Sequence, residues 1–287
     1  MANIRGEGAE RSPNAKERIR DILGLPDAPP LVKAEAFEAL LALTSEELLA
    51  QSRQSLGQAG VGESALREVD ESLEQDLADY SQLDPQSRDS LRTAEFLFRQ
   101  ERQIGGDIDF SRNIGFSFCF AVENESKRCL ARKLHRMLSN PQFYTIIDQL
   151  LEGPTRHLGV FFHQSLLQLQ RDAPMSFSID NVRQVFHRIL EHRERYKPDG
   201  LKAIAILILC FGRTYDVRTA RSRISIENPL ALRGLNDDSD IILLAQRLSR
   251  LQHYRNPYIH PEISEMEAIT AIRQEALACL NVIRRIG

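Results

Sequence analysis

Apolar residues recur at intervals of three or four along most of this chain. The clearest early stripe consists of Leu66, Val69, Leu73, Leu77 and Tyr80. A second stripe near the end consists of Met266, Ile269, Ala276, Leu280 and Ile283. This spacing puts the apolar side chains on one face of an α-helix. The chain is therefore predicted to consist of amphipathic helices that pack around a core.

Proline, glycine and capping residues divide the pattern into separate helices. A capping box of Thr44 and Glu47 starts one helix, an acidic helix follows Gly62 and runs to about residue 83, and Ser264 with Glu267 caps the last one. Residues 213–238 are predicted to be irregular, and no series of strands competes with the helices, so the fold class is mainly α. Further helices are expected over residues 14–23, 31–43, 85–103, 111–139, 141–151, 156–169, 178–192, 198–211 and 240–253.

One segment fits two patterns. Residues 116–120, FSFCF, alternate between apolar and small polar side chains as a strand does. Downstream, Leu130, Leu134 and Met137 return to helical spacing. We therefore predict a continuous helix through this segment.

Charge and composition suggest three regions. Residues 1–13 are small and polar and are predicted to be a disordered tail. Residues 14–104 form an acidic N-terminal helical region, and residues 105–287 form the main helical domain. Residues 1–104 carry 12 Lys and Arg against 20 Asp and Glu, whereas residues 105–287 carry 25 against 20. The C-terminal part is therefore better suited to a polyanionic partner.

Bulk composition narrows the class of protein. Hydrophobic residues make up 42% and charged residues 27% of the 287 positions, as in an ordinary globular protein. The apolar run Ala203–Phe211 is too short to span a membrane, and residues 1–20 do not resemble a signal peptide. We expect a cytoplasmic protein that does not bind a membrane. The four cysteines have no zinc-site spacing, and no metal or cofactor is predicted.

The stretch RNPYIH, residues 255–260, carries the most chemistry. Arg255 offers a permanently charged fork of donors that suits phosphate oxygens, and His260 titrates near neutral pH. Asn256 can hydrogen-bond either side chain, and Pro257 suits the first turn of a helix. The stretch lies between the last two predicted helices, so these side chains can converge on one phosphate.

This stretch resembles the signature of HEPN domains, in which Arg is followed by a polar residue and, four to six residues further on, by His. The resemblance covers residues from about 85 to 287. Three other Arg–His pairs have similar spacing, but they lie in predicted helices: Arg128–His135, Arg156–His163 and Arg247–His253. Arg128 and Arg247 also lack the polar residue after Arg, whereas Arg156 is followed by His157.

The resemblance implies a helical bundle that cleaves single-stranded RNA without metal at a cleft between two copies of the chain. The 2′-hydroxyl attacks the neighbouring phosphorus. Arg255 is expected to stabilise the transition-state charge, His260 to act as general acid or base, and Asn256 to orient His260 or hold the phosphate. Family members often carry a polar residue from an early helix near the site, and Glu123 is the candidate.

Further residues are candidates for RNA binding. Tyr258 can stack on a base, although core packing is the alternative. Basic side chains on two segments can follow the RNA backbone, or simply form solvated helix faces. These basic candidates are Lys127, Arg128, Arg132, Arg218 and Arg221.

Two functional hypotheses remain open. The first is a toxin or anti-phage effector with endoribonuclease activity, held in check by a regulatory or antitoxin protein that the acidic residues 63–79 can dock. The second is a non-catalytic adaptor that uses the same scaffold to dimerise and to bind RNA or a partner protein. A third possibility is that Arg255 and His260 are unrelated surface residues on another kind of helical regulator.

Overall fold

The computed structural model describes most of the helical chain and not the motif after Arg255. By contacts the chain divides into two compact units, residues 1–47 and residues 48–287. In the first unit, helix α1 runs over Ala15–Gly24. The predicted capping boxes at residues 44–47 and 264–267, and the predicted tail, lie largely or wholly outside the described residues. Those described are 15–27, 29, 32–33, 36, 39–40, 43, 63–104, 110–152, 157–172, 175, 177–218, 223–232, 238–255 and 266–286.

Two helices open the described part of the second unit. Helix α3, Glu63–Asp76, buries the predicted stripe on α4, Pro85–Ile104. The acidic helix is shorter than predicted, because it ends at Asp76 and is followed by a 3-10 turn, Tyr80–Gln82. The exposed acidic residues of α3 lie opposite this buried stripe.

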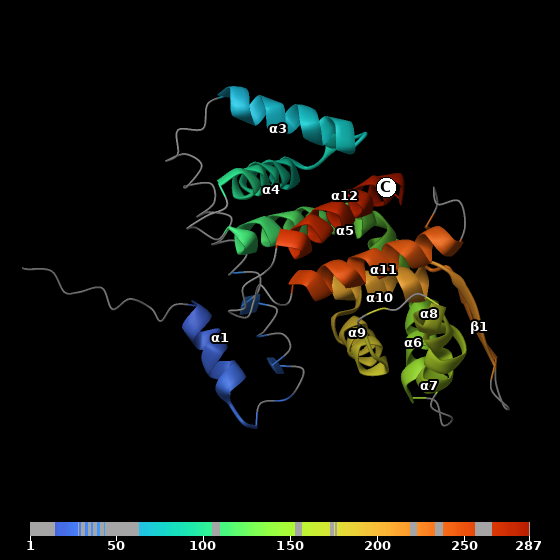
Figure 1. Ribbon diagram of the computed structural model, residues 1–287. Helices are drawn as coiled ribbons and strands as arrows, with labels where there is room; N and C mark the ends of the chain where they lie inside the picture. The colour runs from blue at the N-terminus through green and yellow to red at the C-terminus, as the bar shows by residue number, and fades with distance from the viewer. Residues whose placement is uncertain are drawn as a thin grey trace, which may run out of the picture. The chain divides into compact units, whose positions relative to one another are not determined.

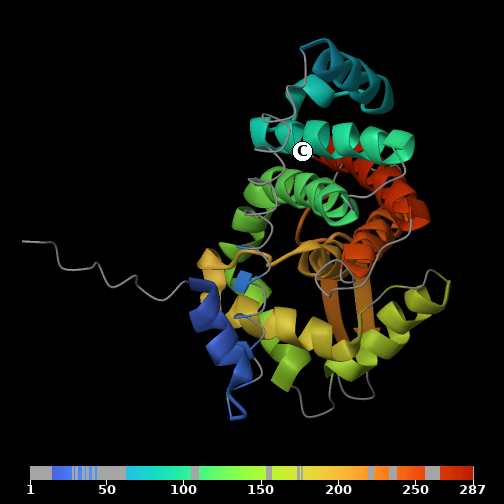
Figure 2. The ribbon, with the colours of Figure 1, turned by 60° about the vertical axis from the view of Figure 1, so that its left-hand side comes forward.

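Helix α5, Ser111–Leu138, is the longest element and confirms the prediction of an unbroken helix through residues 116–120. Both Phe116 and Phe118 are buried, so the apparent alternation reflects a helix that is covered on several sides. Helix α5 packs along α4 and along α12, Met266–Ile286. Figures 1 and 2 show α3, α4 and the α5–α12 pair as successive layers.

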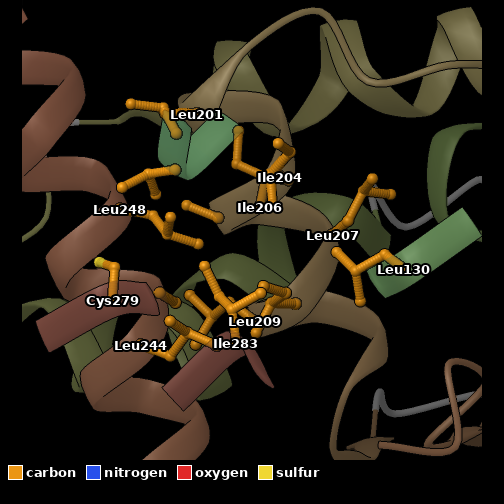
Figure 3. Packing of buried hydrophobic residues seen from close by; sticks show 14 of the residues in the cluster. Leu130, Leu201, Ile204, Ile206, Leu207, Leu209, Leu244, Leu248, Cys279 and Ile283 are labelled. Carbon is orange, nitrogen blue, oxygen red and sulfur yellow. The ribbon is translucent and has the colours of Figure 1, made fainter. Parts of the chain in front are cut away.

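The centre of the core is helix α10, Leu201–Phe211, whose apolar residues face neighbours on all sides. It begins after Gly200, whose φ of 149° suits glycine, and so starts three residues later than predicted. It packs on α11, Asp238–Arg255. Figure 3 shows its side chains meeting residues of α5, α11 and α12, which include Leu130, Leu244, Leu248, Cys279 and Ile283.

A second group of short helices packs below α10. It comprises α6, Pro141–Glu152, then α7, His157–Phe161, and α9, Ile179–His192. Between α7 and α8, Leu167–Asp172, the chain makes a π-helical turn over Phe162–Leu166. After α9 a 3-10 turn, Arg193–Arg195, leads toward α10.

The segment after α10 corrects one prediction. Residues 213–238 are predicted to be irregular, but Thr214–Arg218 and Arg223–Glu227 pair as antiparallel strands β1 and β2. Their apolar residues alternate with exposed ones, so one face of the hairpin is buried beside α7. The fold is therefore mainly α, as predicted, with one small hairpin. None of the helices in the described part of the chain has both the length and the apolar character to cross a membrane.

A network of ion pairs connects α12 to α4 and to α3. Arg273 of α12 donates from Nε to the Glu95 carboxylate of α4 at 2.6 Å, and from Nη2 to Asp76 of α3 at 2.7 Å. Glu95 is 3% exposed and also accepts from Arg99 at 3.1 Å. Charges this deep are stable only in pairs, since each one loses its hydration. Glu95 therefore fixes how α12 meets α4.

Replacing Glu95 with Ala should lower the free energy of unfolding by about 3 kcal/mol, because it leaves the guanidinium of Arg273 beside an apolar gap. The matched control is Asp180→Ala, which removes an exposed ion pair with Arg183 and should cost at most about 1 kcal/mol. Urea denaturation measures both. Equal losses in the two variants would contradict this account of the layer contact.

Candidate functional site

The described chain stops at the first residue of the predicted motif. Arg255 is the last residue of α11, and the description resumes at Met266 of α12. Asn256, Tyr258 and His260 lie outside the described residues. Arg255 therefore closes α11, two residues beyond the predicted end of that helix, and does not lie between the two helices as expected. The approach of His260 to Arg255 stays a prediction.

Arg255 is held inside the protein by a carboxylate. Its side chain is only 8% exposed, and its Nη1 donates to Oε2 of Glu123 at 3.1 Å. The guanidinium also lies over the Phe116 ring, 5.6 Å from the ring centre. Both partners belong to α5, 132 residues before Arg255 in the case of Glu123. The structure therefore brings the candidate polar residue of an early helix against the arginine of the motif.

Glu123 joins Arg255 to one of the predicted RNA-binding lysines. Its Oε1 accepts a hydrogen bond from Nζ of Lys127 at 2.6 Å, one turn further along α5. The Glu123 side chain is 17% exposed and that of Lys127 is 41% exposed. One carboxylate thus bridges a buried cation and a solvent-facing one.

A buried cysteine of α5, Cys119, lies close enough to feel both charges of this pair. Burial raises the pKa of the Cys119 thiol to about 12; the positive charge of Arg255 lowers it and the negative charge of Glu123 raises it. Its Sγ contacts the carbonyl oxygen of Leu251 at 3.8 Å. Cys119 is therefore a protonated packing residue at neutral pH and not a nucleophile.

The other two basic candidates on α5 are Arg128 and Arg132, and within the described part of the chain neither donates a hydrogen bond to Glu123. Arg128 donates from Nε and Nη2 to Glu125 at 3.1 and 2.9 Å. The carboxylate of Glu125 is fully buried and also accepts from the backbone N–H of Asp84 at 2.6 Å. Arg128 therefore balances a structural charge. Arg132 is exposed on the same helix.

Arg218 is the last residue of strand β1 in the hairpin that precedes α11 in the chain. It donates to Asp216 at 2.8 Å, and Arg223 on the opposite strand donates to the same carboxylate at 2.7 Å. These hydrogen bonds, from Arg223 first and from Arg218 second, hold the pKa of Asp216 below its usual value. Helix α11 is about 27 Å long, and the hairpin precedes its first residue in the chain whereas Arg255 is its last. Arg221 lies outside the described residues.

Phe116 and Lys127 are the parts of the site that sequence reasoning did not connect with Arg255. The available signal was helical spacing, since Phe116, Cys119, Glu123 and Lys127 follow one another by three or four residues on one face of α5. Within the described ranges, no three His, Cys, Asp or Glu side chains are grouped so as to hold a metal ion.

Comparisons with known proteins identify no relative of this chain. No protein-family model matches it, and neither the search of characterised proteins nor the search of solved structures found a match.

Replacing Glu123 with Ala should lower the free energy of unfolding by about 3 kcal/mol, because Arg255 is left buried without its carboxylate. Lys127→Ala removes the exposed half of the same bridge and should cost at most about 1 kcal/mol. Urea denaturation of the two variants makes the comparison. If Lys127→Ala were as costly as Glu123→Ala, the burial of Arg255 would not be what makes Glu123 necessary.

Proposed function

We propose that this chain is a metal-independent endoribonuclease of HEPN type that cleaves single-stranded RNA. The observation that supports the proposal is the contact of 3.1 Å between Arg255 and Glu123. A guanidinium presents its N–H donors in a rigid fork, and a carboxylate bound to one arm fixes the direction of that fork. The first residue of the motif is therefore a positioned cation and not a loose surface side chain.

The proposed chemistry follows from the residue types. The 2′-hydroxyl of one nucleotide attacks the adjacent phosphorus, and the bond from phosphorus to the 5′-oxygen of the next nucleotide breaks. His260 moves a proton, either from the attacking hydroxyl or to the leaving oxygen. Arg255 stabilises the charge on the phosphorane-like transition state, and Asn256 orients His260 or the phosphate. The products are a 2′,3′-cyclic phosphate and a 5′-hydroxyl.

The burial of Arg255 adds a condition to this proposal. At 8% side-chain exposure the guanidinium cannot reach a phosphodiester until the groups around it move. The described form is then the resting form, and activity requires a local opening. Such restraint suits a toxin or anti-phage effector, whose activity has to be withheld in a growing cell.

The partners of this enzyme would be RNA, a second copy of the chain and a regulatory protein. Two copies would form the cleft between their motifs. The face of α3 that carries Glu68, Glu71 and Glu74 is exposed, while the stripe around Leu73 is buried against α4. This acidic face is the proposed docking surface for a basic regulatory or antitoxin protein.

The alternative function is a non-catalytic adaptor with the same scaffold. The same burial favours it, since in an adaptor the arginine neutralised by Glu123 would lock α11 onto α5 and need no access to RNA. An adaptor would use the scaffold to dimerise and to bind RNA or a partner, with no cleavage.

His260→Ala should reduce RNA cleavage by about 10²–10⁴-fold, which is the usual contribution of general acid–base catalysis. The matched control is His253→Ala, an exposed histidine in the last turn of α11, and it should cleave at the wild-type rate. Cleavage is followed with a labelled single-stranded RNA, and circular dichroism checks that both variants are folded. Wild-type cleavage by the His260 variant would contradict the proposed site, and no cleavage by any form would favour the adaptor.

A further inference from the structure

A pocket of about 400 Å³ opens between the C-terminal half of α5 and the segment that follows the 3-10 turn after α9. Its floor is lined by Leu134, Leu138, Pro198 and the largely buried Tyr196. Ala131 is exposed beside this floor. The size falls within the range of small-molecule sites, and the floor suits a flat ring or a short apolar group.

The rim of the pocket carries two ammonium groups and one carboxylate, and one of the ammonium groups is also paired with Glu123. Lys127 comes from α5 and Lys197 from the opposite wall, and His135 adds a third nitrogen group. Glu194 supplies one negative charge. Both Lys197 and His135 are exposed, so they can close on an anion without losing a buried contact. An apolar floor beneath cationic groups matches a ligand with a ring at one end and a phosphate at the other.

Lys127 connects this pocket to Arg255. Its ammonium has three N–H donors, and the contact of 2.6 Å with Glu123 uses one of them. An anion bound by Lys127 competes with the Glu123 carboxylate for that ammonium. Glu123 then interacts more strongly with its other partner, Arg255, at 3.1 Å. Occupancy of the pocket is therefore coupled to the ion pair that holds the last turn of α11, and such coupling acts in both directions.

We propose that this pocket binds a nucleotide, with the base on Leu134, Leu138 and Pro198 and the phosphate between Lys127 and Lys197. The nucleotide is either free in solution or part of an RNA chain. The binding claim does not depend on the nuclease proposal, because it concerns a pocket that lies outside the motif. If the chain is a nuclease, the pocket is the place from which a bound nucleotide alters the arginine of its site.

Isothermal titration of the full chain with the four ribonucleoside monophosphates, and separately with a short single-stranded RNA, tests the proposal. At least one monophosphate or the RNA should bind. Lys197→Ala should weaken that binding by about tenfold, the usual effect of losing one charged hydrogen bond. Ala131→Trp, which fills the pocket from an exposed position, should abolish it. Lys133→Ala, on α5 outside the pocket lining, should leave the affinity unchanged.

A separate variant tests the coupling between the pocket and the ion pair of Glu123 with Arg255. Glu123→Gln removes the carboxylate that competes for Lys127 and should strengthen binding several-fold. Binding of a monophosphate alone identifies a free nucleotide as the ligand, and binding of RNA with the same sensitivity to Ala131→Trp identifies an RNA subsite; either result supports the pocket. Absence of all binding, or binding that Lys197→Ala and Ala131→Trp leave unchanged, overturns it. An unchanged affinity in Glu123→Gln overturns the coupling. None of these readouts involves cleavage, so failure here is distinct from failure of the nuclease proposal.

Discussion

The packing of α5 against α4, α11 and α12 is the contact on which the rest of the described structure depends. It buries Phe116, Phe118 and Val122 along the length of the helix. Burial of such side chains contributes about 1.5–3 kcal/mol each, far more than a surface charge pair. Helical periodicity then determines which polar side chains face inward. Glu123 meets Arg255 because the apolar residues on either side of it have already set the rotation of α5.

The ion pair between Glu123 and Arg255 is therefore better understood as a positioning device than as a source of stability. Taking a carboxylate and a guanidinium out of water costs several kcal/mol for each ion, which their attraction only partly recovers. An apolar pair of similar volume would hold the two helices at least as well. What the ions add is direction, since a guanidinium fork bound on one arm has a defined orientation. That orientation is what a phosphate-binding residue needs, and it is set one residue before the proposed catalytic segment begins.

Helical periodicity was sufficient to predict most of the helices, including α5 with its strand-like segment, because a stripe of apolar residues is a local property. The hairpin was missed for the opposite reason. Each of its strands is only five residues long, and the two buried side chains of each strand alternate with three exposed polar or charged ones, so the stretch reads as a polar loop. Contacts between residues far apart in the chain could not be predicted from the sequence either. The family resemblance suggested that Glu123 lies near the motif, but the bridge from Lys127 through Glu123 to Arg255 depends on how α5 and α11 cross.

The chemical identity of the RNA ends tests the central claim most directly. Purified full-length chain is incubated with a labelled single-stranded RNA in the presence of a metal chelator, and the fragments are analysed by mass spectrometry. If Arg255 and His260 promote attack by the 2′-hydroxyl, every cut leaves a 2′,3′-cyclic phosphate and a 5′-hydroxyl. Fragments ending in a 3′-hydroxyl and a 5′-phosphate, or RNA left intact under all conditions including local opening by mild denaturant, would contradict it.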